Sequence, residues 1–189
     1  MKHISVLVGS LRSGSYARKI AQNVLRMFPS DYEATIVEIR DLPLYDADYD
    51  DPANTEKPLP EIYTAFRNTI ANSDGVLFVT PENNRTIPAC LKNAVDVCSK
   101  PAGNVAWKGT PCALMSHSVG AMGGYSAQKN LRLALSYFDM PIMGQPEVFL
   151  GKSPSLLNED GTIANESTRE FLQGYIDKFV ALVEAHPKH

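Results

Sequence analysis

Short apolar runs alternate along the chain with segments whose apolar residues recur at helical spacing. The first apolar run covers residues 4–8, and residues 16–27 then place Ile20, Val24 and Met27 on one helical face. The same alternation predicts further strands at 33–39, 75–79, 111–115 and between 141 and 150. It predicts further helices at 61–72, 88–99, about 125–138 and 168–185. Each strand and helix together have the length that a βαβ crossover needs.

Five strands alternating with helices predict an α/β fold, a flavodoxin-like doubly wound parallel sheet of strand order 2-1-3-4-5 with helices on both faces. No shift in composition divides the chain, so residues 1–189 are expected to form one domain. Strands 1, 3 and 4 are neighbours in this order. The loops after them, 9–15, 80–87 and 116–124, should therefore meet at one ligand site.

The first of these loops has the composition of an anion site. It carries Gly9, Ser10, Arg12 and Ser15 between a strand and a helix, whose N-terminus attracts phosphate. The sequence disfavours a triphosphate loop, because Ser15 and Tyr16 stand where Lys and Ser or Thr are needed. The loop also lacks the second glycine of the dinucleotide-binding fingerprint, so a terminal monophosphate fits better than a pyrophosphate. The alternative is a Ser/Gly turn that binds nothing.

The second loop is rich in amides and bounded by Pro81 and Pro88, a composition suited to presenting donors and acceptors to a flat heterocycle. A surface turn that precedes a helix is the alternative. Glu82 could act as a general base, but we expect it to brace the loop by accepting backbone N–H groups.

The third loop contains three glycines and two hydroxyls, so its N–H groups could stabilise a developing negative charge. His117 raises the possibility of a Ser/His hydrolase, but no G-x-S-x-G elbow is present to hold an attacking serine. His3, His186 and His189 have no metal-ligand spacing to one another, and no metal site is expected.

Composition narrows the class of protein further. The 189 residues are 44% apolar and 21% charged with a net charge of -3, a common profile for soluble globular proteins. No basic cluster exceeds two adjacent residues, and no apolar run approaches the roughly 20 residues of a membrane span, so neither nucleic acid nor membrane is an expected partner. Without a signal-peptide pattern, we expect a cytoplasmic protein.

Two clusters are interpreted as structural. Cys90, Cys98 and Cys112 have no C-x-x-C spacing and are expected to be reduced, small apolar residues. The aspartates of 46–51 alternate as in a calcium loop, but Asp51 replaces the glycine and Lys57 the glutamate that such a loop requires. The segment is therefore expected to be a solvated surface loop.

As a set, five motifs resemble the NAD(P)H-dependent FMN reductases, a family that includes quinone, azo-dye and chromate reductases. The motifs are G-S-L-R-x-G-S at 9–15, D-L-P-L-Y-D-A-D at 41–48, T-P-E-x-N-R-x-I-P at 80–88, L-K-N-A-V-D at 91–96, and the segment 120–132. The resemblance implies an FMN-dependent oxidoreductase that takes hydride from NAD(P)H. Its electrons would pass to a quinone, an azo compound, a metal oxyanion or free flavin. It also implies a homodimer or homotetramer.

The resemblance also implies roles for individual residues. Ser10, Arg12, Ser15 and Tyr16 would hold the FMN phosphate; Pro81, Glu82, Asn83 and Asn84 would line the isoalloxazine; Ser116, Gly120 and Gly123 would lie beside its other side. No residue need be catalytic, because the flavin carries the chemistry.

Three positions depart from the family pattern. Asn83 replaces a common tyrosine, Tyr16 a common asparagine, and Val97-Cys98 a pair that contains tryptophan. Two other functions remain open: a flavodoxin-type electron carrier, which is usually more acidic than this chain, and a nucleotide hydrolase that uses the spacing of Gly9 and Gly14.

Overall fold

The computed structural model describes residues 1–188, and His189 lies outside them. Its elements are β1 (Lys2–Val8), α1 (Tyr16–Leu25), β2 (Tyr32–Val37), a 3-10 turn η1 (Ala47–Asp50), α2 (Glu61–Ala71), β3 (Gly75–Pro81), α3 (Ala89–Val97), β4 (Cys112–His117), α4 (Tyr125–Ser136), β5 (Val148–Leu150), α5 (Ser153–Leu156) and α6 (Glu166–Ala185).

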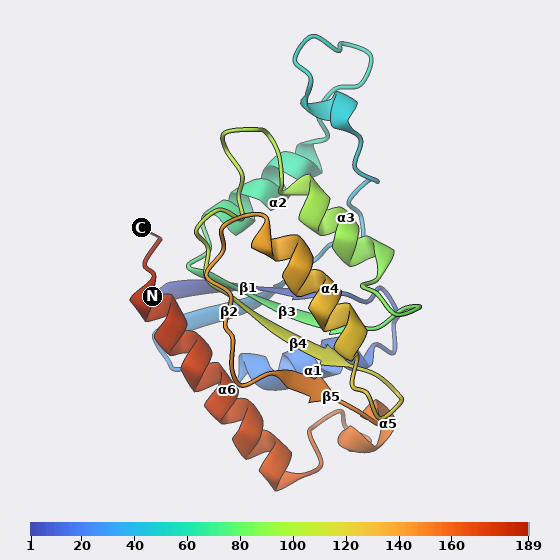
Figure 1. The fold of residues 1–189 in the computed structure, drawn as a ribbon, viewed down its shortest axis with the longest axis vertical. Helices are drawn as coiled ribbons and strands as arrows, with labels where there is room; N and C mark the ends of the chain where they lie inside the picture. Colours follow the sequence, from blue (N-terminus) through green and yellow to red (C-terminus); the bar gives the residue numbers. More distant parts are fainter. Residues whose placement is uncertain (189) are drawn as a thin grey trace.

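The five strands form one parallel sheet in the order β2-β1-β3-β4-β5, which confirms the predicted fold class. Helices α1 and α6 cover one face, and α2, α3 and α4 cover the other (Figure 1). Successive side chains of a strand point to opposite faces, so Leu7 of β1 packs under α2 and α3 while Val6 and Val8 pack under α1 and α6. Buried apolar runs in the sheet are the consequence of this double cover.

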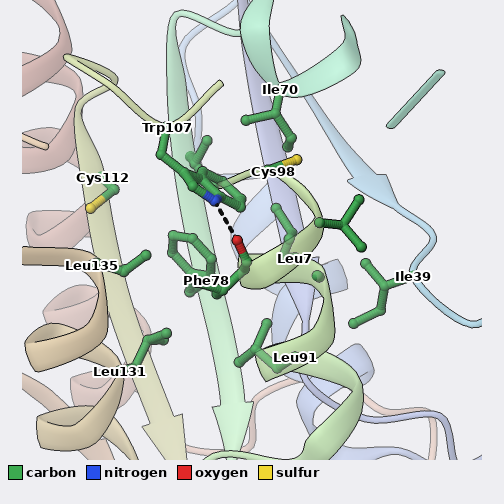
Figure 2. Packing of buried hydrophobic residues seen from close by; sticks show 14 of the residues in the cluster. Leu7, Ile39, Ile70, Phe78, Leu91, Cys98, Trp107, Cys112, Leu131 and Leu135 are labelled. Carbon is green, nitrogen blue, oxygen red and sulfur yellow. Dashed lines mark hydrogen bonds between the residues drawn. The ribbon is translucent and has the colours of Figure 1, made fainter. Parts of the chain in front are cut away.

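The core beneath α3 contains the single tryptophan of the chain (Figure 2). Trp107 is fully buried, its ring lies 5.7 Å from that of Phe78, and its Nε1–H donates to the carbonyl of Val95 at 2.9 Å. Cys98 belongs to the same cluster, as the small apolar residue that the sequence predicts. A tryptophan from a later loop thus fills this core, although residues 97 and 98 supply no aromatic ring.

The ends of two strands differ from prediction in a way that affects the site. β3 continues through Pro81 and β4 through His117, because their backbones pair as Thr80 with Ser116 and Pro81 with His117. Thr80, Pro81, Ser116 and His117, which were expected in loops, are therefore parts of the sheet. β5 has only three residues, and α5 was not predicted because four residues carry no helical period.

The acidic segment is not simply solvated, which corrects the expectation for 46–51. Arg67 of α2 makes two 2.7 Å contacts with the carboxylate of Asp50, and its Nε donates to the carbonyl of Val97 at 2.8 Å. The two side chains of this ion pair are only 9% and 11% exposed. Lys57 pairs with Asp46 and Asp48 at the surface. Lysine and arginine therefore neutralise carboxylates that a calcium site would need.

Two features are absent from residues 1–188. No helix in this range is long and apolar enough to cross a membrane. In the same range, no group of three or more His, Cys, Asp or Glu residues is placed to hold a metal ion. The three cysteines are free, with Cys98 and Cys112 buried and Cys90 partly exposed.

Candidate functional site

A cavity of about 560 Å³ lies at the carboxyl edge of the sheet, where β1, β3 and β4 end. This confirms that the three predicted loops meet at one place, and the volume falls within the range of cofactor sites. The lining consists of Gly9, Ser10, Leu11, Arg12, Ser15, Tyr16, Pro81, Glu82, Asn83, Pro88, Ala89, Cys90, His117, Ser118 and Val119.

The first loop is held on both sides and leaves its cation exposed. The N–H of Gly9 donates to the carbonyl of Val79 at 2.9 Å, and Arg40 donates to the carbonyl of Leu11. Arg12 is exposed and, within residues 1–188, no carboxylate lies within ion-pair distance of its guanidinium. Its charge is thus available to an anion in the cavity.

Helix α1 begins at the wall of the same cavity. Buried Ser15 is its N-cap and accepts from the N–H of Arg18 at 3.1 Å, so its own hydroxyl proton can still be donated to a ligand. The first turn of α1 contains no acidic residue, so no carboxylate in that turn offsets the positive end of the helix dipole. Together with Arg12, this end of the cavity attracts a dianion.

The second loop is a tight turn of unusual backbone conformation. Asn83 and Thr86 exchange two backbone hydrogen bonds of 3.0 Å, and the two residues between them have φ values of +50° for Asn84 and +68° for Arg85. The side chain of Asn130 in α4 donates to the carbonyl of Arg85 at 3.0 Å and so secures the turn. Pro81 and Asn83 line the cavity. Asn84 does not, because the turn carries it to the exposed side.

Glu82 connects this loop to α4. Its carboxylate accepts from the N–H of Ala127 at 3.1 Å, at the third residue of the helix. The expectation that Glu82 accepts a backbone N–H is confirmed, although the donor lies in α4 and not in the loop itself. The N-cap of α4 is Gly124, which offers no side-chain acceptor, so Glu82 supplies one.

The third segment presents residues other than those predicted. Ser116 is buried on the α4 side of β4, where its hydroxyl donates to the carbonyl of Gly123 at 2.8 Å and accepts from Gln128. Gly123 has a φ of +61°, and a Cβ there would lie 2.5 Å from the carbonyl carbon of Phe149, so the close approach of β5 requires glycine. Neither residue lines the cavity, nor does Gly120.

His117, Ser118 and Val119 occupy this part of the lining instead. Since β4 continues through His117, its side chain points to the opposite face from that of Ser116. His117 is 6% exposed, and burial lowers the pKa of its imidazole to about 4. Its Nδ1 lies 2.9 Å from the hydroxyl of Ser153, which is fully buried and so cannot serve as an attacking nucleophile.

Several residues at the site were missed by sequence reasoning, among them Arg40, Cys90 and His117. Arg40 and Cys90 carry no local signal, because both lie outside the three loops: Cys90 lines the cavity, and Arg40 donates to the carbonyl of Leu11 in the first loop. Cys90 is the second residue of α3 and lines the cavity, and burial raises the pKa of its thiol. The alternation of side chains along β4 could have indicated that His117 faces the cavity, but the predicted strand ended two residues too early, at residue 115.

Comparisons with known proteins agree with one another. A family model described as "NADPH-dependent FMN reductase" matches residues 2–155. A quinone reductase of Pseudomonas putida is 48% identical over 181 residues, which cover 96% of this chain and 94% of the relative. A 2-hydroxy-1,4-benzoquinone reductase of a Burkholderia species is 42% identical over 180 residues, 95% of each chain. The solved structure of FerB, a flavoenzyme NAD(P)H:(acceptor) oxidoreductase from Paracoccus denitrificans, has a TM-score of 0.89 and 34% identity and covers 99% of this chain and 100% of FerB.

Proposed function

The chain belongs to the NADPH-dependent FMN reductase family, and from this premise we propose that it is an FMN-dependent NAD(P)H:quinone oxidoreductase. FMN with NAD(P)H as co-substrate follows from the family. A quinone as acceptor is our extension, supported by relatives that are named quinone reductases. The observation that carries the proposal is the cavity itself, which is cationic at the start of α1 and bounded by prolines and amides elsewhere.

The residues of the cavity fit FMN. At one end, the unpaired Arg12, the hydroxyls of Ser10 and Ser15, and the α1 N-terminus beside Tyr16 would hold the phosphate. At the other end, Pro81 and Asn83 would form a wall for the ring, with Glu82 keeping that wall attached to α4. A cavity of about 560 Å³ accommodates most of a ligand of this size.

FMN, when bound, supplies the two-electron chemistry that connects a nicotinamide to a quinone. The protein's part is to bind and orient. Its sheet ends pair with neighbouring strands and its second loop is bounded by prolines, and Val119 and Ala89 add apolar atoms to the cavity wall. Four residues proposed to contact FMN lie outside the cavity lining. They can contact FMN only through backbone atoms of their loops: Asn84, Ser116, Gly120 and Gly123.

Titration with FMN tests the cofactor site directly. Arg12→Ala should weaken FMN binding by about 1.5–3 kcal/mol, the cost of a lost charge-assisted contact, while riboflavin binding should change little. Arg85→Ala is the matched control, because Arg85 is an exposed arginine outside the cavity lining. Equal FMN affinity in the two variants would contradict the phosphate assignment.

Anaerobic assays test the reaction. The FMN-loaded protein should oxidise NADH or NADPH with 1,4-benzoquinone as acceptor, and an azo dye and chromate serve as comparison acceptors. Faster turnover with chromate than with the quinone would overturn the acceptor that we propose. No turnover with either nicotinamide would favour a flavodoxin-type carrier.

We also propose that residues 1–189 act as one FMN-binding domain that assembles into a homodimer or homotetramer through α4. Three large apolar side chains of α4 and its C-cap are exposed: Tyr125 (44%), Leu133 (73%) and, at the C-cap, Tyr137 (86%). Exposed apolar stripes of this kind favour association. Leu133→Glu should yield a smaller species in light scattering coupled to size-exclusion chromatography. An unchanged mass would argue against this surface.

A further inference from the structure

The imidazole of His117 is one of the few buried polar groups with an unused hydrogen-bonding atom. The side chain is 6% exposed and lines the cavity, and its Nε2 has no hydrogen-bond partner within residues 1–188. A buried donor or acceptor left without a partner is costly, so such atoms are uncommon in folded proteins. The atom lies where the proposed function places a ligand.

The other ring nitrogen decides which form of the imidazole is present. Nδ1 lies 2.9 Å from the hydroxyl of Ser153. Ser153 is fully buried, and within residues 1–188 its hydroxyl has no acceptor other than Nδ1. The hydroxyl proton must therefore be donated to Nδ1, because leaving it unpaired would add a second unsatisfied group. In a neutral imidazole, a proton-accepting Nδ1 places the ring proton on Nε2.

The backbone prevents this arrangement from relaxing. His117 is the last residue of β4 and pairs with Pro81 on one side and Leu150 on the other. The N–H of Ser153 donates to the carbonyl of Ser118 at 3.1 Å, which fixes α5 beside the end of β4. The ring of Tyr16 lies edge-on to the imidazole at 6.4 Å between centroids. The histidine is thus held by two strands, a helix start and an aromatic ring.

We propose that the Nε2–H of His117 donates a hydrogen bond to an uncharged oxygen of bound FMN, on the ribityl chain or the isoalloxazine, and that Ser153 is the positioning residue that keeps this tautomer. The inference rests on the proposed FMN site. The phosphate is a poor candidate for the acceptor, because β3 separates β4 from β1, whose loop holds Arg12, so the two strands lie about 10 Å apart.

The neutral charge of the donor agrees with this assignment. Burial holds the pKa of His117 well below its ordinary value, so the imidazole carries no charge at neutral pH. A neutral N–H suits a carbonyl or hydroxyl oxygen, whereas the phosphate has the charged guanidinium of Arg12 in the same cavity.

The test compares three flavins with three variants. Dissociation constants for FMN, riboflavin and lumiflavin, which lacks the ribityl chain, are measured for the full chain and for His117→Leu, His117→Gln and Ser153→Ala. His117→Leu should weaken FMN and riboflavin about tenfold, the size of one hydrogen bond, and His117→Gln, which keeps an N–H donor, should recover part of the loss. A loss that persists with lumiflavin places the acceptor on the ring, and a loss that vanishes places it on the ribityl chain.

Nitrogen NMR of ¹⁵N-histidine-labelled protein supplies a readout that a purely structural role would not move. The unmodified protein should show the tautomer with the proton on Nε2, and adding FMN should slow exchange of that proton. Ser153→Ala should lose the tautomer preference and weaken FMN by less than His117→Leu. Thermal unfolding of each variant identifies any that fails to fold, in which case the NMR of the unmodified protein decides.

Three results would overturn the inference. In the first, the unmodified chain binds FMN, His117→Leu binds each flavin as tightly as the unmodified chain does, and the Nε2 signal does not change on adding FMN. The inference then fails and the proposed function stands. A loss confined to FMN would move the contact to the phosphate and also overturn it. If the unmodified chain binds no flavin, both proposals fail.

Discussion

Gly9 directly follows β1 and lies close to Thr80 of β3. A Cβ built on Gly9 would lie 2.8 Å from the Oγ1 of Thr80, 3.1 Å from a methyl of Leu91 and 3.3 Å from the Cβ of Thr80. Gly14, five residues later in the same loop, has no atom within 4 Å of a Cβ and no positive φ. The two glycines therefore differ in physical role although their chemistry is identical, and Gly9→Ala with Gly14→Ala forms a matched pair.

The magnitude follows from how little the neighbours of Gly9 can move. Thr80 and Leu91 are fully buried, and the Thr80 hydroxyl donates to the carbonyl of Pro81 at 2.8 Å. Overpacking at such a site costs about 1–3 kcal/mol of unfolding free energy. Gly14→Ala should be neutral or stabilising by about 0.4–1 kcal/mol, because alanine restricts the unfolded chain.

Urea denaturation followed by the emission of Trp107, the single tryptophan, measures both variants. Gly9→Ala should also weaken FMN binding, since the strain moves the loop that carries Arg12. Adding Thr80→Ala to Gly9→Ala should cost less than the sum of the two single changes, because the closest contact is removed. If Gly9→Ala is as stable as Gly14→Ala, the reasoning from close approach is refuted.

Three further predictions concern burial and charge. Asp50→Asn should lower stability by about 3–5 kcal/mol, since it leaves the charge of Arg67 buried, and an unchanged urea midpoint would contradict this. Trp107→Ala should cost a similar amount through the cavity that it leaves, whereas Trp107→Phe should cost less; calorimetry measures both, and equal losses would argue against a packing role. The third concerns pH. The pKa of His117 is about 4 in the folded protein and 6.5 in the unfolded chain, so the unfolded chain binds more protons between pH 4 and pH 6.5. The contribution of His117 to the free energy of unfolding is complete above about pH 6.5, and it falls by about 3 kcal/mol as the pH drops to about 4. His117→Gln should remove that part of the slope, and the difference between the two stability curves measures it; parallel curves would refute it.

Much of the fold was predictable because its signals are local. Apolar runs such as residues 4–8 and helical repeats such as Ile20 and Val24 encode which segments are strands and which are helices, since period follows from backbone geometry. The right-handed crossover then leaves few sheet orders, and the observed order is the predicted one. The place of the site follows as well, because the loops after β1, β3 and β4 must meet at one edge.

The side chains that face the cavity were decided by tertiary structure. Whether Ser116 or His117 lines it depends on where β4 stops, and that end is set by pairing with β3 and β5, not by the apolar run itself. Asn84 lies outside the lining, in a turn whose backbone carbonyl at Arg85 accepts a hydrogen bond from Asn130 of α4.

Contacts between distant segments had no signal in the sequence at all. Arg40 reaches Leu11 across 29 positions, and Asp50 meets Arg67 in a buried pair although the surrounding aspartates predict a solvated loop. The sequence by itself thus determined the fold and the edge of the sheet that binds a ligand, since both rest on backbone periodicity and chain handedness. Only the tertiary structure decided the donors and charges at that edge, because burial and partnership depend on segments that no local pattern connects.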